Sequence, residues 1–286
     1  MQAIAPQHQS VINRFVAVCQ ADARVVAAFL GGSYARGAAD AYSDLDFGLI
    51  TTDAACDAFF ADRAAFVRLL GEPAFVQDSR GTYGDIVFFT FPDGVECELM
   101  LGRASHFLHM HVGPYRVLLD KARLLEGVTF PAAAVPLDEQ MAALRDNISW
   151  FWHDLSHHFI TPLARGQRWS AYGALQDLRL ICINLARLSA DVSAPLEGYD
   201  KVEQAVPAER LAPLEATCCD MEPAAMLQAA RVLTRSFHEL AVPLATQYGL
   251  PYPTALEGIM SARLDALRDT LDERPSPPAT TVQSGA

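Results

Sequence analysis

The sequence has no excess of basic residues, no long hydrophobic run and no paired cysteine motif. Its 22 Lys and Arg residues stand against 34 Asp and Glu residues, which gives a formal net charge of −12. A protein that binds a nucleic-acid backbone needs a basic face, so this charge argues against a nucleic-acid polymerase and against any nucleic-acid partner. An acidic surface favours cationic ligands, although most acidic surfaces are simply solvated.

Further absences concern the cellular compartment. No apolar run reaches the length of a membrane span, so we expect no membrane partner. The N-terminal stretch MQAIAPQHQSVINRF has neither a basic flank nor an apolar core, and it is therefore not predicted to be a signal peptide. The six cysteines form no CxxC pair and no zinc spacing, which is typical of structural thiols. We expect a cytoplasmic protein.

Two regions with different hydrophobic periods follow one another along the chain. Residues 1–130 alternate strand and helix patterns, which predicts an α/β domain with a mixed sheet. The segments DIVFFTF and VECELML flank a Pro-Asp-Gly turn and predict a hairpin. FPAAAVP is the best linker candidate. Helices are expected at 10–23, 53–70 and 103–113, and further strands at 25–30, 45–50 and near 115–120.

The second region, residues 137–272, is helical. Its apolar residues recur at spacings of three and four, which predicts amphipathic helices packed as a C-terminal all-α bundle. The tail 273–286 is rich in Pro, Ser and Thr and is predicted to be disordered.

Two acids stand at the head of a strand in FLGGSYARGAADAYSDLDFGLI. Asp44 and Asp46 are two residues apart, so they share one strand face, and the apolar residues between and after them point to the core. Glu96 and Glu98 repeat this arrangement on a later strand. Crowded carboxylates raise each other's pKa, and a divalent cation relieves that cost. Hard oxygen ligands of this kind suit Mg²⁺.

A possible phosphate-binding turn precedes these acids. An apolar strand ends at Gly31 and Gly32, and Ser33 follows at a predicted helix start. Backbone N–H groups at such a turn bind phosphate, and glycine lets the anion approach closely. Arg36 lies one turn along and could reach the same anion. Phosphate at the turn and metal at the acids together indicate metal-assisted phosphoryl or nucleotidyl transfer.

The stretch GGSYARGAADAYSDLDFGLI resembles the signature of the DNA polymerase β-like nucleotidyltransferase superfamily, and its details resemble the small-molecule branch, the aminoglycoside and lincosamide nucleotidyltransferases. The resemblance implies a nucleotidyltransferase fold over residues 1–130 and an ATP-holding turn at Gly32 and Ser33. It also implies two Mg²⁺ ions bound by Asp44, Asp46 and a third acid. We favour Glu98 over Glu96, because its E-L-M-L context is more like the family's, and its role as metal ligand or general base stays open.

The resemblance further implies transfer of AMP from ATP to a hydroxyl of a small and possibly cationic molecule, with an aminoglycoside or lincosamide antibiotic as the leading case. One alternative is a protein-modifying enzyme of the toxin–antitoxin type, which the sizeable second domain disfavours. Another is a non-catalytic nucleotide-binding regulator, which the intact set of acids disfavours.

The helical region is expected to form one wall of the site that binds the acceptor. Trp150 and Trp152 flank an apolar stripe, so at least one of them is predicted to lie outside the core. Aromatic rings and Asp154 would suit a cationic sugar. His153 and His157 are four residues apart, which is a metal-ligand spacing. No third ligand is evident from the sequence, so ordinary surface histidines are the stronger interpretation.

Overall fold

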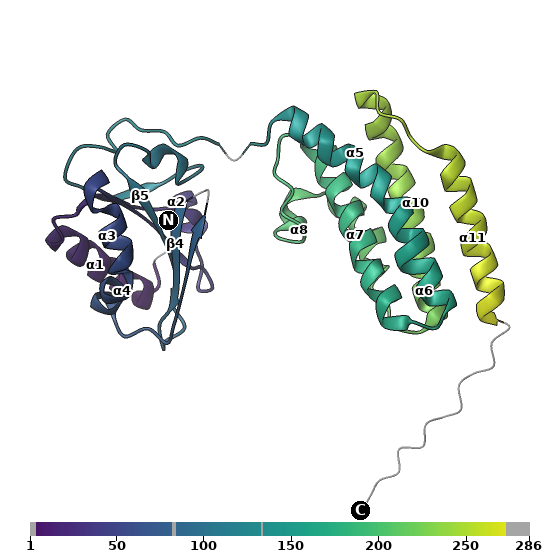
Figure 1. The fold of residues 1–286 in the computed structure, drawn as a ribbon, viewed down its shortest axis with the longest axis horizontal. Coiled ribbons are helices and arrows are strands. Elements are labelled where there is room, and N and C mark those ends of the chain that lie inside the picture. The colour runs from purple at the N-terminus through teal and green to yellow at the C-terminus, as the bar shows by residue number, and fades with distance from the viewer. Residues whose placement is uncertain (1–3, 82–83, 133, 273–286) are drawn as a thin grey trace, which may run out of the picture. The chain divides into compact units, whose positions relative to one another are not determined.

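The computed structural model describes residues 4–81, 84–132 and 134–272, and the chain divides into two compact units, residues 1–133 and 134–286 (Figure 1). The first is an α/β unit and the second is helical, as the two hydrophobic periods predict. The tail 273–286, predicted to be disordered, lies outside the described residues.

A six-stranded mixed sheet forms the centre of the α/β unit. Its strand order is β3-β4-β5-β2-β1-β6. β2 and β5 are parallel, and every other neighbouring pair is antiparallel, including the predicted hairpin of β4 and β5. The strands are β1 (Val25–Leu30), β2 (Leu45–Thr51), β3 (Phe75–Gly81), β4 (Gly84–Thr90), β5 (Glu96–Arg103) and β6 (Arg116–Asp120).

One face of this sheet carries the main core of the unit. Leu45, Phe47 and Leu49 alternate along β2 and are fully buried, as their spacing predicts. The ring of Phe15 stacks on that of Phe47 with centroids 4.0 Å apart. The helices of the unit are α1 (Pro6–Ala21), α2 (Gly32–Arg36), α3 (Cys56–Ala61) and α4 (Arg63–Leu70), with short 3₁₀ turns η1 (Asp53–Ala55) and η2 (Phe107–His109).

The opposite face carries a smaller apolar cluster around Phe29, Phe107 and Phe130. Gly48 of β2 makes room for it, because a Cβ at Gly48 would lie 2.1 Å from Cζ of Phe29. Asp46 shares this face, since it is two residues from Gly48 on the same strand. The alternation along β2 thus places the large apolar side chains on one face of the sheet and the Asp46 carboxylate on the other.

Three sequence predictions in this unit are wrong or incomplete. The helix expected at 103–113 is reduced to η2, because Phe107 and Met110 turn inward over the small cluster. The helix expected at 53–70 is broken at Asp62, whose carboxylate accepts a 2.6 Å hydrogen bond from Arg24. The edge strand β3 was not predicted, because its polar residues show no clear alternation before they pair with β4.

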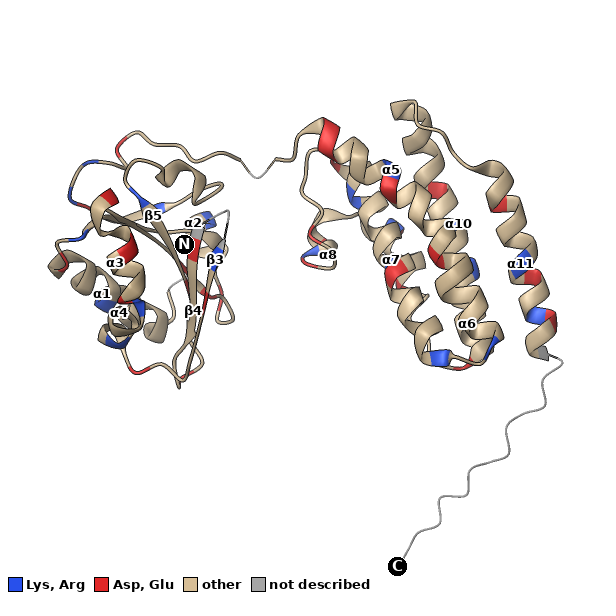
Figure 2. Cartoon of the chain, viewed as in Figure 1, with Lys and Arg blue, Asp and Glu red and all other residues tan. Residues whose placement is uncertain are grey.

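The helical unit packs its long helices around one core, which includes Phe151, Leu178 and Phe237. Trp152 is buried, whereas Trp150 is 55% exposed, which confirms the prediction that at least one of the two rings lies outside the core. Acidic and basic residues are interspersed along α11 (Figure 2). The helices are α5 (Leu137–His153), η3 (Asp154–Ile160, a π-helix), α6 (Thr161–Ala164), α7 (Arg168–Ala190), α8 (Val202–Ala205), α9 (Ala208–Glu215), α10 (Pro223–Tyr248) and α11 (Thr254–Asp272).

Among the described residues, no helix has both the length and the apolar character needed to cross a membrane.

Candidate active site

The predicted phosphate turn is the junction between β1 and α2. β1 ends at Leu30, and α2 begins at Gly32 with Gly31 as its N-cap. The Gly31 amide donates to the carbonyl oxygen of Asp46 at 2.8 Å, which ties the turn to the start of β2. The two sequence motifs, eleven residues apart at their nearest ends (Ser33 and Asp44), therefore meet in space.

The side chain of Asp46 lies directly against Gly32. Its φ of +54° lies in the left-handed region, which glycine adopts at little cost. A Cβ at this position would lie 1.6 Å from Oδ2 of Asp46 and 2.5 Å from its Cγ. Glycine is thus required here twice over, for its backbone conformation and for the space that the carboxylate occupies.

Ser33 presents a buried hydroxyl. Its Oγ has no hydrogen-bond partner among the residues that the structure describes. A buried polar atom left unpaired costs about 1–3 kcal/mol, so this hydroxyl calls for a partner, and a bound anion is one that would satisfy it. The hydroxyl is a suitable donor to a phosphate oxygen at the start of α2.

A short turn holds Asp44 at the entry to β2. The Asp40 amide donates to Oγ of Ser43 at 2.9 Å, and the Tyr42 amide donates to Oδ1 of Asp40 at the same distance. Asp44 itself is exposed and directly precedes the strand, whereas Asp46 within the strand is half-buried. The two aspartates therefore differ in environment, although their sequence spacing is that of a same-face pair.

The parallel pairing of β2 with β5 brings one of the two candidate glutamates opposite Asp46. Asp46 is directly opposite Glu98 in the register, whereas Glu96 is exposed and opposite Thr90 of β4. Burial, followed by the charges of Asp46 and Asp44, raises the pKa of the half-buried Glu98 carboxyl above its ordinary value. A cation at this place would remove both costs.

The residues present fit Mg²⁺ in their chemistry. Asp44, Asp46 and Glu98 offer hard oxygen donors beside a turn that has an unpaired hydroxyl. Their carboxylates do not converge within 4.8 Å of one another. Binding of an ion by all three would therefore require the side chains to close in, with substrate phosphates supplying further oxygens.

Arg36 lies at the C-terminal end of α2 and is exposed. It lines a 540 Å³ pocket together with Tyr34, Tyr115 and Arg116. The two guanidinium groups give this pocket anion-binding character. Arg116, from β6, had no signal in the sequence, because only the sheet brings β6 alongside β1. Neither Ser33 nor the acids of β2 and β5 line this pocket.

His111 is a second residue that sequence reasoning missed. A Cβ at Gly31 would lie 2.7 Å from Cε1 of this imidazole, so the ring covers the glycine turn. Its Nε2 donates to the carbonyl oxygen of Pro114 at 3.0 Å, and its ring packs near Phe29 and Phe130. His111 thus supports the turn from a loop far along the chain.

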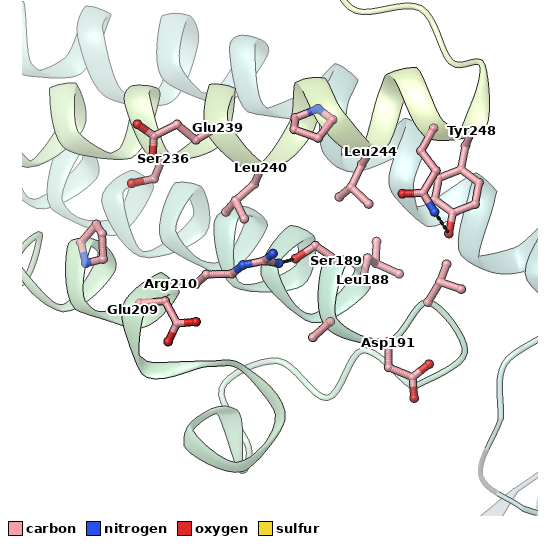
Figure 3. Close-up of a pocket in the computed structure, with 15 residues that line it drawn as sticks. Leu188, Ser189, Asp191, Glu209, Arg210, Ser236, Glu239, Leu240, Leu244 and Tyr248 are labelled. Carbon is pink, nitrogen blue, oxygen red and sulfur yellow. Dashed lines mark hydrogen bonds between the residues drawn. The ribbon is translucent and has the colours of Figure 1, made fainter.

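The helical unit has a pocket of its own. It has a volume of 580 Å³ and lies among the end of α7, α9 and α10. Figure 3 shows Arg210 reaching across it to Ser189, with which it forms a hydrogen bond. Asp191, Glu209 and Glu239 also line the pocket, so acids outnumber bases there. None of the predicted catalytic residues lines it.

Comparison with known proteins identifies the family. The model of the streptomycin adenylyltransferase family matches residues 6–265. Similar solved structures include an aminoglycoside 6-adenyltransferase from Bacillus subtilis, at 15% identity over 91% of this chain and 97% of that chain, with a TM-score of 0.44. They also include a nucleotidyltransferase-like protein from Exiguobacterium sibiricum, at 15% identity over 93% and 88% of the two chains, with a TM-score of 0.34. No curated protein matched the sequence.

The family match extends over nearly the whole chain and includes both the glycine turn and the acids of β2 and β5. The resemblance to the small-molecule branch of the DNA polymerase β-like superfamily is thereby confirmed. The chain belongs to the streptomycin adenylyltransferase family and is a nucleotidyltransferase.

Proposed function

We propose that this enzyme transfers AMP from ATP to a hydroxyl group of an aminoglycoside antibiotic, with Mg²⁺ as its metal. One observation carries the proposal: the Asp46 carboxylate lies on Gly32 of the phosphate turn and opposite Glu98 in the sheet register. This arrangement supports a site in which the proposed phosphate-binding and metal-binding groups act together. The description of the matched family supports adenylyl transfer and the acceptor class.

Gly32 and Ser33 have the role of holding the triphosphate. The backbone at Gly32 is open to close approach, and the buried Ser33 hydroxyl supplies a donor that has no other partner among the described residues. Arg36 and Arg116 supply positive charge at the neighbouring pocket. Asp44 and Asp46 have the role of binding Mg²⁺, which when bound neutralises phosphate charge and aids the leaving group.

Glu98 has the role of general base. Its raised pKa makes it a better proton acceptor than an ordinary surface carboxylate. The acceptor's hydroxyl oxygen attacks the α-phosphorus of ATP and forms a new phosphodiester bond. The bond between the α-phosphorus and the oxygen that bridges to the β-phosphorus breaks, and pyrophosphate leaves. Glu98 takes the hydroxyl proton.

A cationic acceptor agrees with the charge of the chain. The formal net charge of −12 attracts amines, and aminoglycosides carry several of them. Modification of a hydroxyl on such a drug would confer antibiotic resistance, in keeping with the matched family. Lincosamides and protein hydroxyls are the rival acceptors.

The test is a transfer assay with the full chain, Mg²⁺ and ATP labelled at the α-phosphate. Streptomycin, other aminoglycosides, lincosamides and a protein extract are offered separately. We expect label on an aminoglycoside with one pyrophosphate released per transfer, and we expect Asp46→Asn to abolish it. Label on lincosamides or protein alone would overturn the proposed acceptor. No transfer from ATP to any of these acceptors would overturn the proposed reaction.

A further inference from the structure

The helical unit contains a π-helix, η3, which directly follows α5. In an α-helix residues three or four apart share a face, whereas the wider π turn brings residues five apart together. π-helical turns are rare and occur frequently at functional sites. The inner side chains of η3, including Leu155, Phe159 and Ile160, are buried in the core of the unit. The orientation of its outer side chains is fixed as a result.

This orientation brings His153, Asp154 and His158 together on the outer face. One donor atom of each lies within 4.8 Å of the other two. They are the one such group of three His, Cys, Asp or Glu side chains among the residues that the structure describes. The sequence spacing pointed to His153 with His157 instead, which is the pair expected of an uninterrupted α-helix.

The contacts within this group suit a cation. Nε2 of His158 lies 3.9 Å from Oδ1 of Asp154, and the rings of His153 and His158 are 5.4 Å apart in an edge-on arrangement. Asp154 is half-buried, and this burial raises the pKa of its carboxyl. Asp177 raises that pKa further, while the two histidines lower it. A bound cation beside the half-buried Asp154 carboxylate would stabilise its charged form.

We propose that His153, Asp154 and His158 bind a Zn²⁺ ion or a similar first-row transition metal. Two imidazole nitrogens and one carboxylate oxygen are a recognised zinc ligand set, and three protein ligands leave a fourth position for water or another ligand. Imidazole favours Zn²⁺, Ni²⁺ and Cu²⁺ over Mg²⁺, which prefers oxygen. This site is therefore chemically distinct from the acids of β2 and β5.

The chain offers a built-in reporter for such binding. All three tryptophans lie in the helical unit, and the ring of the exposed Trp150 is 5.1 Å from that of His153. A bound Cu²⁺ or Ni²⁺ ion would quench Trp150 fluorescence. Zn²⁺ would bind without quenching and would compete with the quencher. Cys218 and Cys219 are replaced by serine in every protein tested, because the exposed thiol of Cys218 and the half-buried thiol of Cys219 could also bind zinc.

The experiment titrates Zn²⁺ into the full-length, tag-free chain by calorimetry, with Ni²⁺ quenching as a second readout and Mg²⁺ as the comparison metal. We expect one Zn²⁺ per chain and no competition by Mg²⁺. We expect His158→Gln to weaken zinc affinity by at least about tenfold, since even loss of an outer-shell partner costs ~10–100-fold. His157→Gln is the matched control, because its ring lies 4.6 Å from that of His153 but outside the group.

Two outcomes would overturn the assignment. If the parent chain, in which His153, Asp154 and His158 are intact, binds no zinc, or if all variants bind it equally, these residues form no metal site. If His157→Gln loses zinc and His158→Gln keeps it, the binding pair is the α-helical one and the π-helix is not involved. Asp154→Asn provides a second variant in case His158→Gln fails to fold, as judged by circular dichroism, and it should also lose affinity.

Discussion

The carboxylate of Asp46 fills the space that a side chain at Gly32 would need, because a Cβ on Gly32 would lie 1.6 Å from Oδ2 of Asp46. The glycine turn and the acid-bearing strand β2 are therefore not independent motifs. Any side chain at position 32 must displace the carboxylate of Asp46, so the two positions act as a unit.

Two glycine substitutions, one at the site and one as a control, test this relationship. Gly32→Ala should nearly abolish transfer and should also destabilise the α/β unit, since an L-residue in the left-handed region costs about 1–2 kcal/mol. Gly37→Ala is the control, because Gly37 has a φ of +71° with nothing within 4 Å of its Cβ position. It should show a similar stability loss and keep its activity. Equal activity in the two variants would contradict the role given to Gly32.

Removal of the Ser33 hydroxyl should separate stability from function. Ser33→Ala eliminates a buried unpaired oxygen, so we expect the α/β unit to gain about 1 kcal/mol while the KM for ATP rises. Ser43→Ala is the contrast, because the Ser43 hydroxyl donates to Oδ1 of Asp40 at 3.1 Å and its loss should destabilise the turn. Thermal unfolding and steady-state kinetics check both variants. An unchanged KM for ATP in Ser33→Ala would count against phosphate contact.

The base role of Glu98 predicts a particular kinetic pattern. Glu98→Gln should lower kcat by about 10²–10⁴-fold, the usual contribution of a general base. The Mg²⁺ concentration for half-maximal activity should stay near that of the wild type. A large rise in that concentration would show instead that Glu98 is chiefly a metal ligand. Glu96→Gln, on the same strand but exposed, should behave like the wild type.

The raised pKa of Glu98 also predicts how stability depends on pH in the absence of metal. The pKa of Glu98 is higher in the folded chain than in the unfolded chain. The contribution of Glu98 to the free energy of unfolding is therefore fully present below pH 4.5, the ordinary pKa of the group. It is lost as pH rises through the raised pKa. In EDTA, the wild type should therefore lose stability relative to Glu98→Gln as pH rises towards neutrality.

Hydrogen exchange in β2 and β5 is the appropriate measurement, since all three tryptophans report on the helical unit. Glu96→Gln should retain the wild-type pH dependence. A constant difference between the wild type and Glu98→Gln across the pH range would refute the prediction.

A buried arginine supports the helical unit. Nε of Arg179 donates to Oγ1 of Thr217 and Nη2 donates to the Thr217 carbonyl oxygen, each at 2.8 Å. Thr217→Val keeps the side-chain shape but leaves Nε without this acceptor, so we expect a loss of about 1–3 kcal/mol. Urea unfolding followed by tryptophan fluorescence measures it. Thr246→Val, at an exposed site on α10, should change stability by less than about 0.5 kcal/mol.

Local patterns were sufficient to predict much of this protein. Period-two alternation places Leu45, Phe47 and Leu49 in the core and leaves Asp46 on the opposite face, since strand geometry allows no other division. The long amphipathic stripes predict α7 and α10 for a similar reason, because helical period and burial coincide over many turns. The glycine turn and the Asp-x-Asp pair carry the resemblance to the nucleotidyltransferase superfamily, which the family match confirms.

The rest depended on contacts between distant segments. The E-L-M-L context already favours Glu98 over Glu96, but the position of Glu98 opposite Asp46 rests on the register of two parallel strands, which the local sequence does not encode. His111 and Arg116 approach the turn and its neighbouring pocket only because the later loop and β6 pack beside β1.

The tertiary structure also decided the helix type at η3. There the buried inner residues hold a π turn, which brings His158 to Asp154 and His153, while His157 also stays beside His153. The sequence by itself determined which residues alternate, repeat and turn, because these are properties of neighbours along the chain. Register, close approach and helix winding depend on long-range packing, and only the folded structure could decide them.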